Sequence, residues 1–240
     1  NRRSAPAGRG NRLYLFVSRR ASGGGGPAPV IVYFHGGLAN KMIGSRALIY
    51  RMAAQGWVCV SAGRRQIRAG HGEQLTDVRA ALAWVRDNVA AYGGDPDRVL
   101  AIGGSAGANL AATAALSGSG VAGVIGLYGY YGDFGGGAGS ASPRQVINAD
   151  APPFFIIHGT LDTLVPHHRA REFADRLRAV SDRPVVYAEL PGAQHSFDVF
   201  SSIRLHAVTD AVMRFAEITL SANGSEHSDR PTPGTGRWQS

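Results

Sequence analysis

Residues 99–116 read VLAIGGSAGANLAATAAL, and the fold follows from this stretch. The apolar run at 99–102 predicts a buried strand, and the residues from Ala106 to Leu116 are mostly strong helix formers. Between them, Gly103-Gly104-Ser105-Ala106-Gly107 matches Gly-x-Ser-x-Gly. Strand, tight turn and helix form the setting in which this motif projects a serine hydroxyl. In a chain with 33 glycines the match alone is weak, and the alternative is a glycine-rich turn with an idle serine.

Short apolar runs recur on both sides of this segment. They predict strands at 13–18, 30–34, 57–61, 99–102, 121–128, 154–157 and 185–190. Apolar residues spaced by three and four predict a helix over 75–89, and further helices are expected at 45–55, 106–117, 167–180 and 203–220. Strands alternating with helices predict an α/β fold with a mostly parallel central sheet and helices on both faces.

Length and composition fit one such domain. The 240 residues are 44% hydrophobic and 18% charged, and a chain of this size can bury one sizeable core. We expect the domain to span residues 30–220. Residues 1–29 are expected to hold a strand and a flexible linker, with 1–10 flexible, and the polar segment 221–240 is expected to be disordered.

A serine nucleophile needs a base within hydrogen-bond distance. Among eight histidines, His195 lies in a turn-like loop just after the strand predicted at 185–190. Asp162 lies just after the strand predicted at 154–157. Ligands and catalysis gather at the carboxyl ends of strands in open α/β sheets, and the chain order Ser, Asp, His is that of an α/β-hydrolase. We therefore predict a triad of Ser105, Asp162 and His195, with Asp133 and Asp198 as the rival acids.

Such a triad also needs donors for the oxyanion of the tetrahedral intermediate. His35-Gly36-Gly37-Leu38 follows the first strong core strand, and the Ala106 N–H is next to the serine. We predict an oxyanion hole from backbone N–H groups of Gly36, Gly37, Leu38 and Ala106. The alternative for the first segment is a plain glycine turn.

These motifs resemble the hormone-sensitive-lipase-like bacterial carboxylesterases and lipases of the α/β-hydrolase superfamily. The resemblance covers about residues 30–220 and rests on His35-Gly36-Gly37, Gly93-Gly94-Asp95-Pro96-Asp97, Gly103–Gly107, His158-Gly159-Thr160-Leu161-Asp162 and Gly192–Phe197. It implies the same triad, amide donors at Gly37, Leu38 and Ala106, and a loop-orienting role for His35.

The chain departs from the pattern of that family at three places. Leu38 replaces a third glycine, while Gly104 and Ala108 replace the acid and the last glycine of the usual Gly-Asp-Ser-Ala-Gly-Gly. Only some thirty residues precede His35, so we expect the N-terminal cap to be reduced or absent. The first two departures leave the triad intact, and the third bears on substrate choice. Tyr128, Tyr130 and Tyr131, together with the glycine-rich loop 132–139, are expected to line the substrate pocket.

Charge and composition bound the partners. The net charge is +8, but Lys41 is the only lysine and the arginines are scattered without interleaved aromatics, so no nucleic acid partner is expected. Cys59 lies in an apolar run and is expected to be a buried structural thiol. No apolar stretch approaches the roughly 18 residues needed to span a bilayer. The expected compartment is the cytoplasm, with cell-envelope association left open, and the oligomeric state is not indicated.

The predicted function is hydrolysis of small-molecule carboxylic esters through an acyl-enzyme, with no metal or organic cofactor. Two alternatives remain open at this point. One is amide hydrolysis of the arylformamidase or peptidase type, which uses the same triad. The other is a catalytically impaired binding protein on the same scaffold.

Overall fold

The computed structural model describes residues 2–6, 12–17, 26–37, 46–63, 70–133 and 142–228. Strands and helices alternate along these segments, as the sequence predicts. The strands are β1 Arg2–Pro6, β2 Arg12–Phe16, β3 Ala28–Phe34, β4 Val58–Ala62, β5 Gly94–Gly104, β6 Gly123–Leu127, β7 Phe154–Gly159 and β8 Val185–Leu190. The helices are α1 Arg46–Ala54, α2 His71–Asn88, α3 Ala106–Leu116, α4 His167–Arg178 and α5 Ile203–Ser228, with short 3₁₀ turns η2 Val89–Tyr92 and η3 Pro143–Gln145.

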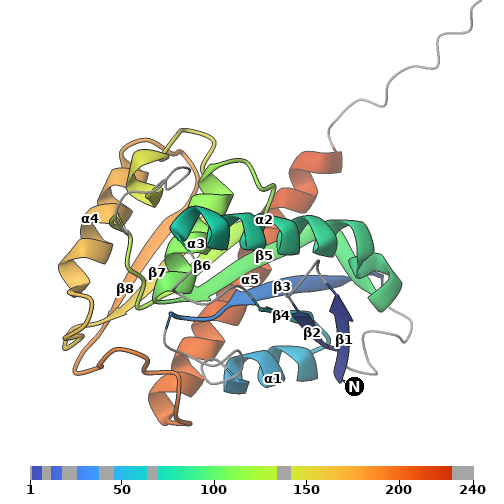
Figure 1. The fold of residues 1–240 in the computed structure, drawn as a ribbon, viewed down its shortest axis with the longest axis horizontal. Helices are drawn as coiled ribbons and strands as arrows, with labels where there is room; N and C mark the ends of the chain where they lie inside the picture. The colour runs from blue at the N-terminus through green and yellow to red at the C-terminus, as the bar shows by residue number, and fades with distance from the viewer. Residues whose placement is uncertain are drawn as a thin grey trace, which may run out of the picture.

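All the described strands join one sheet of eight, in the order β1-β2-β4-β3-β5-β6-β7-β8. The pairs β1–β2 and β2–β4 are antiparallel, and every pair from β4 to β8 is parallel. Buried parallel strands need helical crossovers, and the helices therefore cover both faces. In Figure 1, α2 and α3 lie on one side of the sheet and α1 and α5 on the other.

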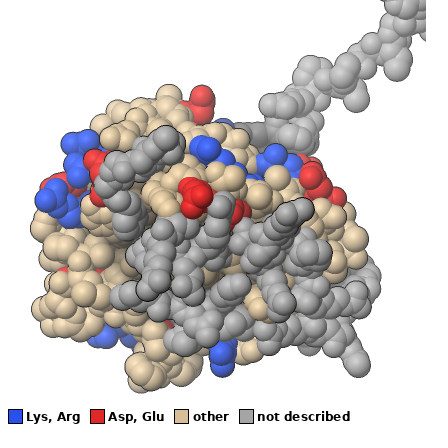
Figure 2. All heavy atoms as spheres, viewed as in Figure 1, with Lys and Arg blue, Asp and Glu red and all other residues tan. Residues whose placement is uncertain are grey.

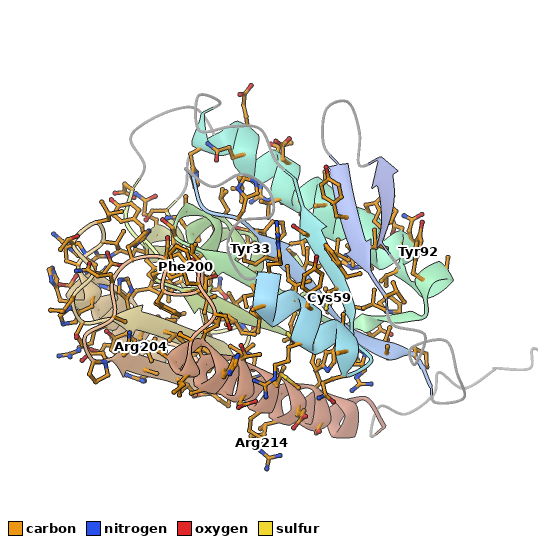
Figure 3. The ribbon with its side chains drawn as sticks, turned by 90° about the horizontal axis from the view of Figure 1, so that it is seen from below. Tyr33, Cys59, Tyr92, Phe200, Arg204 and Arg214 are labelled. Atoms are coloured by element: carbon orange, nitrogen blue, oxygen red, sulfur yellow. The ribbon has the colours of Figure 1, made fainter. Side chains whose placement is uncertain are left out.

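Residue alternation along the strands divides the core into two layers. In β3, Val30, Val32 and Phe34 join the cluster beneath α2, α3 and α4. Ile31 and Tyr33 face the other way and join the cluster with α1 and α5. This is the period of two that a strand imposes on its side chains. The α1 and α5 layer lies nearest the viewer in Figure 3, where Tyr33 and Cys59 are labelled.

Both ends of the predicted domain differ from expectation. Residues 1–10 are expected to be flexible, but Arg2–Pro6 forms β1 and pairs with β2, with Ser4 opposite Tyr14. The segment after residue 220 is expected to be disordered, but α5 continues to Ser228. Residues 18–25 of the expected linker and 229–240 of the expected tail lie outside the described residues.

The net positive charge is not gathered on the face shown in Figure 2. Among the described residues of that face, basic and acidic side chains are interspersed. Exposed ion pairs occur among the described residues, including Arg178 with Asp175 at 2.9 Å. Such exposed pairs add little stability.

Candidate active site

The turn that holds Ser105 has a strained backbone, and it can form only because the residues packed against it are small. Ser105 sits between β5 and α3 with φ 53° and ψ −121°, a conformation that a residue with a Cβ rarely adopts. A Cβ on Gly103 would lie 2.3 Å from the Gly107 carbonyl, and one on Gly107 would lie 2.1 Å from the Phe34 oxygen. The two glycines therefore let strand, helix and the end of β3 approach closely, which is the physical reason for the Gly-x-Ser-x-Gly pattern.

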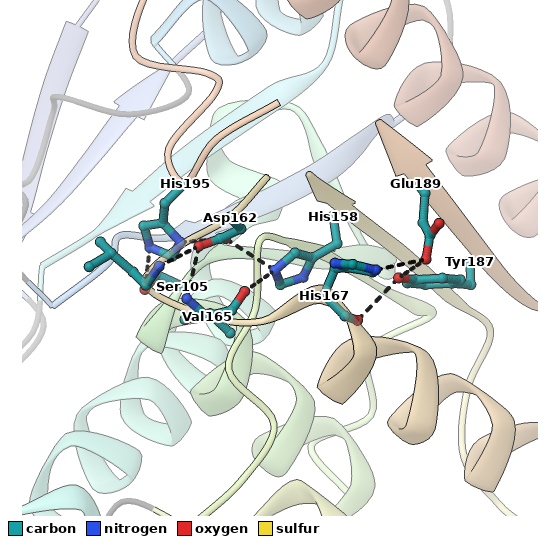
Figure 4. Close-up of polar contacts among 9 residues, drawn as sticks. Ser105, His158, Asp162, Val165, His167, Tyr187, Glu189 and His195 are labelled. Atoms are coloured by element: carbon teal, nitrogen blue, oxygen red, sulfur yellow. Dashed lines mark hydrogen bonds and ion pairs between the residues drawn. The ribbon is translucent and has the colours of Figure 1, made fainter. Parts of the chain in front are cut away.

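The three predicted triad residues form one hydrogen-bonded line at the carboxyl edge of the sheet (Figure 4). The His195 Nε2 lies 3.0 Å from the Ser105 Oγ, and its Nδ1 lies 2.7 Å from the Asp162 Oδ2. A carboxylate only accepts, so Nδ1 carries the proton and Nε2 is left to accept from the serine hydroxyl. Ser105 and His195 are partly exposed while Asp162 is buried. The geometry gives a substrate access to the hydroxyl but not to the acid.

Asp162 is held by four donors. Its Oδ1 accepts the backbone N–H groups of Leu164 at 3.0 Å and Val165 at 2.8 Å. Its Oδ2 accepts from His195 and lies 3.1 Å from the Nε2 of His158, a fully buried residue of β7. Both carboxylate oxygens are therefore fixed in place by donors on the surrounding backbone and side chains.

The second histidine on this carboxylate has a defined proton. The His158 Nε2 also contacts the Val165 carbonyl oxygen at 2.8 Å, and a carbonyl only accepts, so this nitrogen carries the hydrogen. Burial lowers the pKa of His158 from its usual value of 6.5, against the raising effect of its contacts with Val165 and Asp162. His158 is therefore a neutral donor, and it is a contact that the sequence did not disclose.

The loops after β7 and β8 pack backbone against backbone. The Leu161 N–H donates to the Ala193 carbonyl at 3.0 Å, and a Cβ on Gly159 would lie 2.3 Å from that oxygen. The glycine in His158-Gly159 thus allows the His195 loop to come close enough for its imidazole to reach Asp162.

The predicted oxyanion loop lies against the nucleophile turn. A Cβ on Gly36 would be 3.4 Å from the Ser105 Cβ, and the His35 Nδ1 donates to the Gly36 carbonyl at 2.8 Å. Ala106 is the first residue of α3, where an N–H has no partner within its own helix. Gly37 is partly buried at the end of this segment. Leu38 lies outside the described residues, so its part in the hole stays a prediction.

Tyr130 and Tyr131, two of the tyrosines expected in the pocket, have different surroundings in the structure. Tyr131 is 1% exposed and stacks on Phe173 with ring centres 4.3 Å apart, so its placement in the substrate pocket is wrong. The physical reason is that Gly126 and Gly129 have no side chains, and the Tyr131 ring packs into the space that a Cβ at either position would occupy. The Tyr130 hydroxyl donates to the Asp133 carbonyl at 2.9 Å.

Tyr130 instead lines a surface hollow of about 480 Å³ between η3 and α4. The lining includes Arg144, Arg169 and Arg176 but not Ser105 or His195. A role for Tyr130 in substrate binding therefore stays a prediction.

The rival acids do not contact the histidine in the way that Asp162 does. Asp198 is buried and accepts the Tyr128 hydroxyl at 2.7 Å. The Asp133 carbonyl accepts the Tyr130 hydroxyl. Neither residue replaces Asp162 as the partner of the His195 Nδ1.

Comparison with known proteins places this chain in a family. A family model described as BD-FAE matches residues 20–125 and 136–177, which are more than half of the chain. The chain belongs to the BD-FAE family. BD-FAE domains are hormone-sensitive-lipase-like α/β-hydrolases, so the family resemblance and fold class expected from the motifs are confirmed.

Relatives of this BD-FAE chain carry esterase names. It is 37% identical to the probable carboxylic ester hydrolase LipM of Mycobacterium tuberculosis, over 84% of this chain and 57% of the relative. It is 35% identical to esterase LipQ of the same organism, over 88% of this chain and 60% of the relative. The chain thus spans less than two thirds of the length of these relatives.

Solved structures share the fold of this BD-FAE chain. A thermophilic esterase, Est2 of Thermogutta terrifontis, superposes with a TM-score of 0.77 at 22% identity, covering 92% of each chain. The same esterase phosphorylated by paraoxon superposes with a TM-score of 0.75 at 23% identity, covering 90% of this chain and 91% of that one. Within the described residues, we find no helix long and apolar enough to cross a membrane.

Proposed function

We propose that this chain hydrolyses carboxylic esters through a covalent acyl-enzyme formed on Ser105. The observation that carries the proposal is the line from the Ser105 Oγ through His195 to Asp162, with contacts of 3.0 and 2.7 Å. A serine hydroxyl is a weak nucleophile until an adjacent base takes its proton, and this line supplies the base and its orienting acid.

In the first half of the reaction, the Ser105 Oγ attacks the ester carbonyl as His195 Nε2 takes the hydroxyl proton. The ring then carries a positive charge, which the Asp162 carboxylate stabilises through Nδ1–H. When the tetrahedral intermediate collapses, the imidazolium returns the proton to the leaving alcohol. In the second half, His195 takes a proton from water, the resulting hydroxide attacks the acyl carbon, and Ser105 regains its proton as the acid leaves.

The developing oxyanion needs fixed donors at each tetrahedral step. The proposed donors are the N–H of Ala106, at the N-terminus of α3, and those of Gly36, Gly37 and Leu38 in the loop after β3. The contact of Gly36 with the Ser105 Cβ supports this placement. The helix dipole of α3 adds a partial positive charge at the same point.

The substrate class rests on the relatives. LipM and LipQ are named as a probable carboxylic ester hydrolase and an esterase. Both are longer than this chain, so ester hydrolysis is proposed here and the alcohol and acyl groups are left to the experiment.

The test compares p-nitrophenyl acetate, butyrate and octanoate with the p-nitroanilides of the same acids. Wild type is expected to hydrolyse the esters, and Ser105→Ala to lose about 10⁴-fold or more in kcat. Ser201→Ala is the matched control, because the Ser201 Oγ also lies near a histidine ring, 3.5 Å from the Nε2 of His206, but this pair is exposed and, among the described residues, makes no hydrogen bond to the triad. It is expected to behave as wild type. Preference for the anilides would favour an amide hydrolase, and a folded but inert wild type would favour a binding protein.

A further inference from the structure

A buried tyrosine stands directly behind the imidazole of His195. Tyr128 follows β6, is 3% exposed, and donates its hydroxyl to the Asp198 Oδ1 at 2.7 Å. Its ring lies edge-on to the His195 ring, with centres 4.8 Å apart and planes at 64°. It meets the Phe197 ring in the same manner at 5.2 Å and 86°. Tyr128, at the end of β6, thus contacts the imidazole of His195 and two residues that follow it in the loop, Phe197 and Asp198.

The residues around the contact of Tyr128 with His195 include strained backbone positions. Within the described residues, the non-glycine positions with positive φ are Ser105, Tyr128 and Ser196, at 53°, 41° and 57°. They are the nucleophile, the tyrosine and the residue after His195. Such conformations persist only where surrounding contacts hold them. For Tyr128 those contacts include its N–H on the Ile157 carbonyl at 2.8 Å and its hydroxyl on Asp198.

The tyrosine also explains a departure in the nucleophile motif. A Cβ on Gly104 would lie 2.6 Å from the Tyr128 hydroxyl oxygen and 3.0–3.1 Å from its ring carbons. The Tyr128 side chain therefore takes the space that a larger residue before Ser105 would need. Gly104, Tyr128 and Asp198 form one continuous contact from the nucleophile turn to the histidine loop.

We propose that Tyr128 and Asp198 are positioning residues, which hold the imidazole of His195 at the angle from which Nε2 meets the Ser105 hydroxyl. This role rests on the proposed ester hydrolysis. Neither residue contacts the reacting atoms in this account, since Asp162 already occupies the Nδ1 of His195. Burial, with smaller effects from Tyr33 and Asp198, raises the pKa of Tyr128, so its hydroxyl is a neutral donor at neutral pH.

The test removes the hydroxyl and keeps the ring. In Tyr128→Phe the aromatic ring keeps its edge contact with the imidazole, but the hydrogen bond from the tyrosine hydroxyl to Asp198, which fixes that ring, is lost. We expect kcat for p-nitrophenyl butyrate to fall about tenfold, the scale of one buried hydrogen bond, with KM within about twofold. The matched control is Tyr187→Phe, because the Tyr187 hydroxyl also donates to an acid, Glu189, at 2.9 Å. It is expected to leave kcat unchanged.

A spectroscopic readout makes the test independent of turnover. The His195 Nδ1–H bonded to Asp162 is expected to give a downfield proton resonance that is absent in His195→Gln. In Tyr128→Phe this resonance should broaden or shift upfield, and in Tyr187→Phe it should not. If wild type is inert on esters but its resonance still responds to Tyr128→Phe, ester hydrolysis is refuted while the positioning contact stands.

Rescue by a conservative change covers the case in which Tyr128→Phe does not fold. Asp198→Asn keeps an oxygen that accepts the tyrosine hydroxyl, whereas Asp198→Ala removes it. The proposal requires a larger loss of kcat in Asp198→Ala than in Asp198→Asn. Equal values in these two variants, or an unchanged kcat and resonance in folded Tyr128→Phe, would overturn it.

Discussion

Replacing Asp162 by asparagine tests the role of the acid directly, because every hydrogen bond of this carboxylate is accepted from a donor. Oδ1 accepts two backbone N–H groups, and Oδ2 accepts from His195 and from the Nε2–H of His158. An asparagine must turn its NH₂ toward one of these pairs. If the NH₂ faced the backbone, it would lie against two N–H groups, which can only donate. If it faced the histidines, it would lie against His195, which can change its tautomer, and His158, whose tautomer is fixed by its bond to Val165.

The second orientation is the less costly one, since His195 can become an acceptor at Nδ1. Its proton then moves to Nε2, which no longer accepts from Ser105. We expect kcat/KM to fall about 10³–10⁴-fold, the cost of the wrong tautomer in a serine triad. His158 keeps its bond to Val165 but faces an N–H group, so the free energy of unfolding should drop by about 1–2 kcal/mol.

The assay pairs ester kinetics with urea denaturation for Asp162→Asn and Asp198→Asn. Asp198 is the matched control because it is also a buried aspartate, with a tyrosine hydroxyl as its donor. Its amide variant should lose far less activity. Activity of Asp162→Asn within about tenfold of wild type, together with a large loss in Asp198→Asn, would show that the acid has been assigned to the wrong residue.

Three further predictions follow from the same contacts. Gly107→Ala places a Cβ 2.1 Å from the Phe34 carbonyl oxygen and should destabilise the fold by about 3 kcal/mol or more in urea denaturation, whereas Gly70→Ala, with nothing within 4 Å, should be neutral. Because burial depresses the pKa of His158 below 6.5, the unfolded chain binds a proton there before the folded one does, so its contribution to stability is complete above pH 6.5 and is lost as pH falls toward the folded-state pKa. His158→Gln should therefore show a shallower loss of unfolding free energy between pH 7.5 and 5 than wild type, and parallel curves would refute this. Cys59 is fully buried, and burial raises its pKa, so a thiol-reactive disulfide should not modify the native chain or change ester hydrolysis, and rapid modification at neutral pH would contradict its burial.

Much of the fold was predictable because its signals are local. Apolar runs and their spacing give the order of elements, and parallel strands bring their carboxyl ends to one edge. Residues that follow three separate strands, Ser105, Asp162 and His195, were therefore expected to meet, and the structure brings them within hydrogen-bond distance.

The remainder depends on contacts that no local pattern encodes. Arg2–Pro6 has no strand-like alternation and becomes β1 through pairing with β2. Tyr131 was expected in the pocket from its position in the sequence, but Gly126 and Gly129 have no side chains and leave room for its ring in the core. His158 had no predicted role beyond its place in the motif that ends at Asp162, and its contact with that carboxylate forms only when the loop after β7 folds back.

Tyr128 shows the same limit at the site itself. The sequence marks it as one of several aromatic residues near a glycine-rich loop. Its left-handed backbone and its contacts with Asp198 and His195 arise from packing between β6 and the loop after β8. Gly104 was the one available signal, because a missing side chain before the nucleophile indicates that something else fills that space.

The most direct measurement is covalent labelling by a fluorophosphonate, followed by peptide mapping of the modified chain. A hydroxyl made nucleophilic by a neighbouring imidazole should be phosphonylated stoichiometrically at Ser105 in wild type, slowly in His195→Gln and not at all in Ser105→Ala. A folded wild type that stays unmodified, or that takes the label on a different residue, would contradict the account.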